Sequence, residues 1–165
     1  MVSQREQKVY AYLEKLNIPY IRHEHPPVYT VEEAKQYEKG IPGTHCKNIF
    51  LCDKNKEHYY LVVLVNSKKL DFKQLYRQLE AKNLRFAPAE KLFEYLGLEA
   101  GAVSPFGLVN DVEKKVEVLI DSDIMEAEQV NFHPNVNTAT LTISTNDFQK
   151  FLGHCGNKTT YIQLE

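Results

Sequence analysis

Charged and polar side chains meet an apolar strand in the stretch Gly43-Thr44-His45-Cys46-Lys47-Asn48-Ile49-Phe50-Leu51. Turn-forming residues flank the stretch, which predicts a strand. Because strand side chains alternate, Lys47, Ile49 and Leu51 share one side, and Cys46 and Asn48 lie on the other. If Ile49 and Leu51 face a core, we expect the Lys47 ammonium at the mouth of a cavity. The alternative is a strand-end lysine that reaches water.

The composition is that of a soluble globular protein, with 43% hydrophobic and 25% charged residues among 165. We expect one domain, residues 1–165, located in the cytoplasm, because no apolar run suggests a leader or a membrane span. Three cysteines are an odd number and suit reduced thiols. The net charge of −2 excludes an extended basic face for DNA or long RNA, so an RNA partner would be held locally.

Periodicity predicts an α+β fold. Two capping boxes, Ser3 with Glu6 and Thr30 with Glu33, open helices, and the apolar run of residues 61–65 predicts a strand buried on both faces. Strands and helices do not alternate as they do in a wound parallel sheet. We therefore expect a curved mixed sheet, mainly antiparallel, or a partial barrel, flanked by helices.

Three chemistries fit the polar residues. Cys46 could act as a nucleophile, but its neighbour His45 faces the other side of a regular strand, so His133 would have to be the base. A metal could bind among histidines and a cysteine, although no spacing matches a structural zinc site; these residues are His23, His25, His45, Cys46 and His133. Finally, Lys47, Asn48 and a His133-Pro134-Asn135 turn could surround a small anionic or ester substrate.

Three motifs in register support the last reading. They are Gly43 to Leu51, Gly101-Ala102-Val103-Ser104-Pro105-Phe106-Gly107-Leu108-Val109-Asn110-Asp111, and Phe132-His133-Pro134-Asn135 with the region 138–151 that follows. Together they resemble the ProX family of prolyl-tRNA editing proteins, within the wider YbaK-like superfamily that includes the editing domain of bacterial prolyl-tRNA synthetases. The resemblance covers nearly the whole chain in the same order.

This resemblance implies a free-standing aminoacyl-tRNA deacylase that hydrolyses mischarged tRNA(Pro), above all alanyl-tRNA(Pro), without a metal or an organic cofactor. It assigns catalytic roles to Lys47, Asn48, Gly101 and His133. Substrate contacts are expected from His45, Ser104, Pro105, Phe106, Pro134 and Asn135. The expected partner is the acceptor end of tRNA(Pro), and a transient association with prolyl-tRNA synthetase stays open.

The ester of an aminoacyl-tRNA is already activated, so positioning and electrostatics can suffice for its hydrolysis. Lys47 would hold the terminal phosphate or stabilise the carbonyl oxygen, and backbone N–H groups around Gly101 could do the latter. The vicinal ribose hydroxyl or a protein base would orient the water. Two alternatives from other classes are an inactive aminoacyl-tRNA-binding module and an auxiliary protein of proline metabolism.

Overall fold

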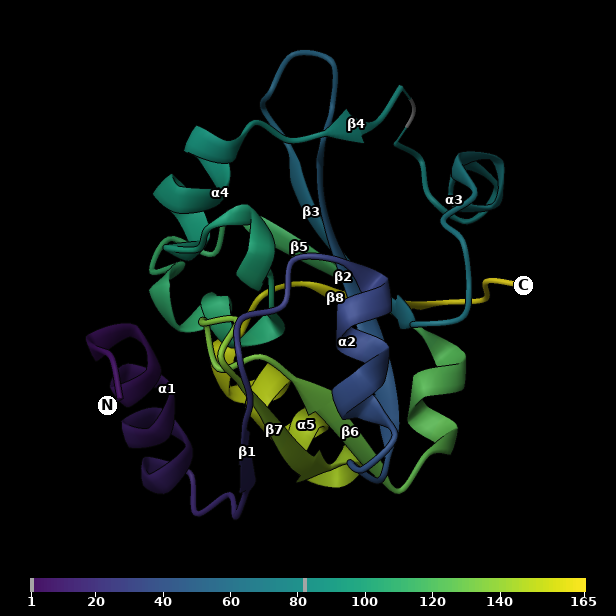
Figure 1. Ribbon diagram of the computed structural model, residues 1–165. Coiled ribbons are helices and arrows are strands. Elements are labelled where there is room, and N and C mark those ends of the chain that lie inside the picture. Colours follow the sequence, from purple (N-terminus) through teal and green to yellow (C-terminus); the bar gives the residue numbers. More distant parts are fainter. Residues whose placement is uncertain (1, 82) are drawn as a thin grey trace.

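The computed structural model describes residues 2–81 and 83–165, and its arrangement is shown in Figure 1. The α-helices are α1 (Gln4–Lys15), α2 (Val31–Glu38), α3 (Phe72–Gln78), α4 (Ala89–Leu96) and α5 (Thr145–Cys155). Both predicted capping boxes begin helices: Ser3 accepts from the Glu6 N–H, and Thr30 accepts from the Glu33 N–H. Within the described residues, no helix is long and apolar enough to cross a membrane.

The described strands form one eight-stranded mixed sheet with open ends, flanked by helices, which confirms the predicted fold class. They are β1 (Ile21–Glu24), β2 (Thr44–Cys52), β3 (Tyr59–Val65), β4 (Arg85–Phe86), β5 (Val116–Asp121), β6 (Gln129–Phe132), β7 (Ala139–Ser144) and β8 (Thr159–Ile162). The order is β1-β7-β6-β2-β3-β5-β8, with β4 paired to β2. Strand β2 is antiparallel to β3 and parallel to β6.

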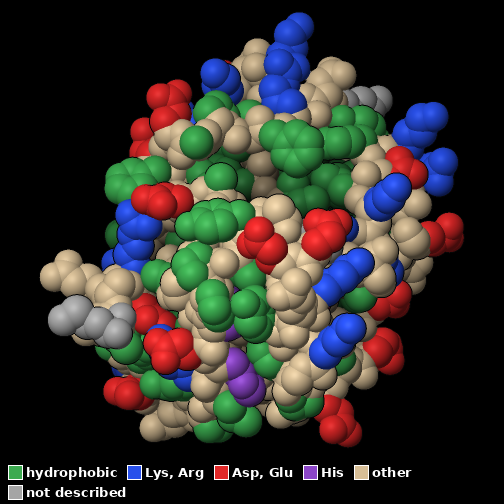
Figure 2. All heavy atoms as spheres, viewed as in Figure 1, with side chains coloured by type: hydrophobic (Ala, Val, Ile, Leu, Met, Phe, Trp, Pro, Cys, Tyr) green, Lys and Arg blue, Asp and Glu red, His purple; other side chains and the backbone are tan. Residues whose placement is uncertain are grey.

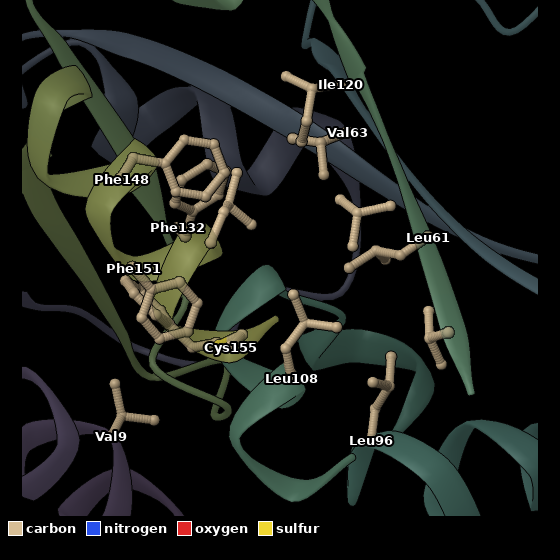
Figure 3. Packing of buried hydrophobic residues seen from close by; sticks show 14 of the residues in the cluster. Val9, Leu61, Val63, Leu96, Leu108, Ile120, Phe132, Phe148, Phe151 and Cys155 are labelled. Carbon is tan, nitrogen blue, oxygen red and sulfur yellow. The ribbon is translucent and has the colours of Figure 1, made fainter. Parts of the chain in front are cut away.

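Strand β2 is covered on both faces. Phe50 belongs to the larger apolar cluster, in which side chains of α1, α4 and α5 meet the sheet, as Figure 3 shows. Leu51, one residue later, belongs to a second cluster with α3. The prediction for residues 61–65 is confirmed in the same way, since Leu61 and Val63 contribute to the first cluster and their neighbours to the second.

The glycine-containing segment 97–111 is more regular than its sequence suggests. It holds two 3₁₀ helices, η1 (Ala100–Ala102) and η2 (Pro105–Asn110), and a third, η3 (Ser122–Glu126), follows β5. Gly107 lies against Leu96 and Leu98, where a Cβ atom would come within 2.7 Å of the Leu98 side chain. This close contact holds η2 against the end of α4.

Candidate functional site

A small hollow of about 50 Å³ lies where α2 meets β2, β6 and β7. We call it the histidine hollow, because His25 and His133 both line it, with their ring centroids 6.0 Å apart. Other polar groups on its wall come from Tyr37, Asn48 and Thr140. Figure 2 shows histidine side chains among hydrophobic ones on the face of the molecule drawn there.

His133 is held in one tautomer. Its Nδ1 lies 2.8 Å from the carbonyl oxygen of Ala139, and a carbonyl can only accept, so Nδ1–H donates and Nε2 carries the lone pair. Burial lowers the pKa of His133 below its ordinary value; the Ala139 hydrogen bond opposes this shift, and nearby His25 adds to it. His133 is therefore a neutral imidazole with a free acceptor at neutral pH.

His25 is fixed in the same way. Its Nδ1–H donates to the carbonyl oxygen of Pro26 at 2.9 Å, and its Nε2 is hydrogen-bonded to the hydroxyl of Thr140, also at 2.9 Å. The ring stacks on Tyr37 of α2, with 5.2 Å between centroids. These contacts join the segment after β1 to α2 and β7, and they make His25 a rigid wall of the hollow.

Asn48 supplies an unpaired acceptor. It lies on the face of β2 that carries Cys46 and Phe50, as the strand alternation predicts. Its Oδ1 is buried and has no hydrogen-bond partner among residues 2–81 and 83–165. Since an unsatisfied buried acceptor is unfavourable by about 1–3 kcal/mol, a ligand that brings a donor into the hollow would relieve this cost.

Lys47 lies on the other face of β2. Its ammonium donates to the carbonyl oxygen of Lys68 at 2.6 Å, in the turn after β3. The Lys68 side chain is itself held by the buried carboxylate of Asp121, at 2.9 Å, and by Asp123. Lys47 shares its face with Ile49, as predicted, but the structure does not bring it into the histidine hollow. Its catalytic role stays a prediction.

Gly101 lines a second hollow of about 180 Å³, separate from the first. Arg5, Tyr29, Glu99, Asn135 and Asn137 are among its other lining residues. Gly101 is exposed, and a Cβ atom there would have its nearest neighbour 3.6 Å away, at Asn137 Nδ2. A ligand can therefore approach the Gly101 backbone, and the catalytic role of Gly101 stays a prediction.

The other predicted substrate contacts lie in different places. His45 lines the histidine hollow and donates from Nε2 to the carbonyl oxygen of Ile41 at 3.0 Å. Three are buried without lining either hollow: Ser104 caps η2 by accepting from the Phe106 N–H at 3.1 Å, Phe106 packs in the large cluster, and Pro105 lies between them. Direct substrate contact by these three stays a prediction.

The last motif splits its residues between core and site. Pro134 is buried without lining either hollow, and Asn135 lines the second hollow. Asn135 has a φ angle of 64°, a left-handed conformation that asparagine tolerates better than most residues. The turn at Pro134 and Asn135 thus sends the chain from the His133 side of the site to the Gly101 side.

Geometry disfavours the two competing chemistries. Cys46 lines the histidine hollow, but burial raises the pKa of its thiol, and the negative charge of Asp121 raises it further. A protonated thiol is a poor nucleophile. In the described part of the chain, no three His, Cys, Asp or Glu side chains are grouped so that they could hold a metal ion.

A sequence profile of the family described as "Aminoacyl-tRNA editing domain" matches residues 25–151, which include both hollows' central residues. The chain belongs to this aminoacyl-tRNA editing domain family. It is 39% identical over 159 residues to the prolyl-tRNA editing protein ProX of Acetoanaerobium sticklandii, covering 96% of this chain and 97% of that protein.

Two further relatives extend the likeness to whole chains. Prolyl-tRNA synthetase associated domain-containing protein 1 of Xenopus laevis is 33% identical, with 100% of both chains covered. The crystal structure of a candidate trans-editing enzyme for prolyl-tRNA synthetase superposes with a TM-score of 0.73 at 19% identity, again over 100% of both chains. At that identity the structural likeness shows the shared fold.

Some residues of this editing domain's histidine hollow escaped sequence reasoning. In the sequence, His25 stands out only as a possible metal ligand, and no motif points to Tyr37 or Thr140 as site residues. The available signal was the row of threonines that alternates with apolar residues in β7, since a polar row facing a covered side of a sheet needs polar partners. Thr140 has His25 as such a partner.

Proposed function

We propose that this protein is a free-standing aminoacyl-tRNA deacylase that hydrolyses mischarged tRNA(Pro) in the cytoplasm, with alanyl-tRNA(Pro) as its preferred substrate. The whole chain, residues 1–165, would act as one editing domain in trans. Membership of the editing family and the likeness to ProX over nearly the full length support the reaction class and the tRNA. The shape of the histidine hollow supports the choice of amino acid.

The size of the histidine hollow is the observation that carries the choice of substrate. The hollow has a volume of about 50 Å³, whereas a cavity that holds one enclosed water has a volume of roughly 10–15 Å³. By this comparison the hollow holds about three to five waters, so the methyl and ammonium groups of an alanyl ester fit readily, whereas a pyrrolidine ring would fill the space to its limit. Steric exclusion of this kind discriminates more sharply against a larger side chain than a large pocket does against a smaller one.

The polar groups of the hollow suit the alanyl ester. Asn48 Oδ1 would accept a hydrogen bond from the α-ammonium group and so gain the partner it lacks. His133 Nε2 would accept a proton from the attacking water as its oxygen bonds to the ester carbon. The ester C–O bond then breaks, and the ribose oxygen takes the proton from His133 Nε2 and leaves as a hydroxyl. The products are free alanine and tRNA.

The charge that develops on the carbonyl oxygen needs donors. The backbone N–H of the exposed Gly101 is our proposed source, because this residue has no side chain to keep a ligand away from its backbone. Lys47 is the other proposed contributor, and its ammonium would have to leave the Lys68 carbonyl to reach a substrate. Otherwise it would act as a positioning residue that ties the start of β2 to the turn after β3.

The tRNA would be held mainly at its acceptor end. The net charge is −2, and on the face drawn in Figure 2 the Lys and Arg side chains are interspersed with Asp and Glu. Such a surface supports few phosphate contacts. A transient association with prolyl-tRNA synthetase is also proposed, on the strength of the name of the Xenopus laevis relative.

Deacylation assays over a panel of mischarged tRNAs test this proposal. Alanyl-tRNA(Pro) should be hydrolysed much faster than prolyl-tRNA(Pro) or cysteinyl-tRNA(Pro). Preferred hydrolysis of the cysteinyl ester would contradict the specificity and keep the reaction class. Binding of alanyl-tRNA(Pro) without turnover would identify an inactive binding module, and absence of both would favour an auxiliary role in proline metabolism.

A further inference from the structure

The second hollow has the features of a ligand site in its own right. Tyr29 lines it with 76% of its surface exposed, which is unusual for so large an aromatic side chain. The ring lies beside the Gly101 backbone, since a Cβ atom on Gly101 would be 3.9 Å from Tyr29 Cδ1. Arg5 lines the same hollow and contributes a guanidinium group, which is shared with Glu99 at 3.4 Å.

Asn135 adds an unsatisfied polar atom to this hollow. The residue is 2% exposed, and its Nδ2 group donates to the carbonyl oxygen of Phe106 at 3.4 Å. This contact sets the orientation of the amide, because the Phe106 carbonyl can only accept. Asn135 Oδ1 is then a buried acceptor without a partner among the described residues. A buried acceptor in a hollow wall indicates a missing donor.

The two hollows lie on either side of one short bridge. Val28 lines the histidine hollow, and Asn137 lines the second hollow. The Val28 N–H donates to the Asn137 carbonyl at 3.3 Å, and Asn137 Nδ2 donates to the Val28 carbonyl at 3.2 Å. These two hydrogen bonds form the bridge, and each of the two segments that they join lines both hollows. Tyr29 of the second hollow follows Val28 directly, and the segment from His133 to Asn137 runs from one hollow to the other.

We propose that the second hollow binds the terminal nucleoside of the substrate RNA, with its base stacked on Tyr29. This inference rests on the proposed function, in which the aminoacyl group occupies the histidine hollow. The ester joins that group directly to the ribose of the last nucleotide, so the nucleoside must occupy space beside the hollow. The second hollow is such a space, one hydrogen-bonded bridge away.

The chemistry of the second hollow matches a nucleoside. Every base has a π face that can stack on an exposed aromatic ring, with no requirement for sequence. A nucleoside also carries hydroxyl donors, and adenine and cytosine carry an exocyclic amine, any of which would satisfy Asn135 Oδ1. Arg5 can face the 5′ phosphate of the same nucleotide once it shares its charge between Glu99 and the ligand.

Competition experiments on the deacylation reaction test this site. The probes are adenosine 5′-monophosphate and ribose 5-phosphate, which share the sugar and phosphate and differ in the base. Adenosine 5′-monophosphate should inhibit hydrolysis of alanyl-tRNA(Pro) competitively, and ribose 5-phosphate should do so at least about tenfold more weakly, as expected from the loss of stacking. Equal inhibition by the two probes, or none by either, would overturn the assignment of a base site.

Variants separate stacking from general effects on folding. Tyr29→Ala should raise both the inhibition constant of adenosine 5′-monophosphate and the KM for alanyl-tRNA(Pro) about tenfold, and Tyr29→Phe should restore both. The matched control is Tyr161→Ala, which removes another exposed tyrosine, on β8. If the wild-type protein hydrolyses alanyl-tRNA(Pro) and the Tyr29→Ala variant binds adenosine 5′-monophosphate and the tRNA as tightly as the wild type does, this inference is overturned and the proposed function is not. Absence of wild-type turnover would instead contradict the proposed function.

Discussion

The Nδ1–H of His133 donates to the carbonyl oxygen of Ala139 over 2.8 Å, which leaves Nε2 of the same ring as an acceptor in the histidine hollow. The pKa of His133 lies below its ordinary value because the ring is buried and faces His25. The imidazole is therefore neutral at neutral pH and stays so below the ordinary histidine pKa of about 6.5. This relationship determines how activity should respond to acid.

We expect kcat/KM for alanyl-tRNA(Pro) to hold as the pH falls to about 6.5 and to decline only below it, as His133 takes a proton. Between pH 6.5 and the lower pKa of His133 in the folded protein, the unfolded chain binds more protons than the folded one. The free energy of unfolding should therefore also decrease as the pH is lowered through this range. Both trends should be weaker in His133→Gln, which keeps a donor for Ala139. An acid limb at or above 6.5 in the wild type would contradict this assignment.

Asn48→Ala should separate function from stability. The change removes a buried acceptor that has no partner, so the free energy of unfolding should change by less than about 1 kcal/mol, while deacylation falls tenfold or more. Asn131→Ala is the matched control in the wall of the same hollow, because Asn131 donates to the Pro42 carbonyl at 2.9 Å and accepts from Thr142. Its loss should destabilise the fold by about 1–3 kcal/mol. Urea unfolding and single-turnover deacylation measure the two effects.

Lys47→Ala tests whether the lysine acts on the substrate. Loss of the hydrogen bond to Lys68 should lower the free energy of unfolding by about 1–2 kcal/mol, and the protein should still fold. Activity should fall about a hundredfold or more if the ammonium stabilises charge during the reaction. Lys47→Arg should not rescue it fully, because a planar guanidinium does not mimic a point charge.

Cys46→Ser is the control for Lys47. The thiol lines the hollow, but its raised pKa keeps it protonated, so the serine variant should retain most activity. Circular dichroism confirms folding of each variant before single-turnover assays. An inactive Cys46→Ser beside an active Lys47→Ala would restore the thiol mechanism.

Two glycines of the same segment should respond differently to alanine. Gly107→Ala places a Cβ atom 2.7 Å from Leu98 Cδ1 and 3.1 Å from the Leu96 carbonyl oxygen, which should destabilise the fold by about 1–3 kcal/mol. Gly101→Ala meets nothing closer than 3.6 Å, so stability should stay within about 0.5 kcal/mol. Deacylation by Gly101→Ala should nevertheless drop, because the methyl group obstructs the approach to the backbone. Thermal unfolding with matched activity assays distinguishes packing from access.

The salt dependence of tRNA binding reports the size of the RNA contact. With a net charge of −2 and interspersed surface charges, the slope of log Kd against log salt concentration should correspond to about two to four phosphates. Filter binding of uncharged tRNA(Pro) across a salt series measures it. A slope near ten phosphates would reveal a much larger basic interface than this chain offers.

Local signals in the sequence predicted the local structure well. The caps at Ser3 and Thr30 begin helices as expected, because each side chain satisfies an N–H group three residues away. Alternation also grouped Lys47 with Ile49 and Asn48 with Cys46 correctly. Which group lines a cavity could not be predicted, since β2 is covered on both faces. His25, Tyr37 and His133 lie close together because strands that are distant in the sequence pair with one another, as β1 and β6 do with β7. No local sequence pattern encodes such pairings.

Strand β2 carries different chemistry on its two covered faces, and this constrains how the chain can change during evolution. A shift of one residue in its pairing with β3 would move Asn48 out of the histidine hollow and turn Lys47 into it. Insertions and deletions within Thr44–Cys52 should therefore abolish the function of the site even where the protein still folds. The turn that follows, closed by the Asp53 N–H and the His58 carbonyl, lies outside this constraint and can vary in length.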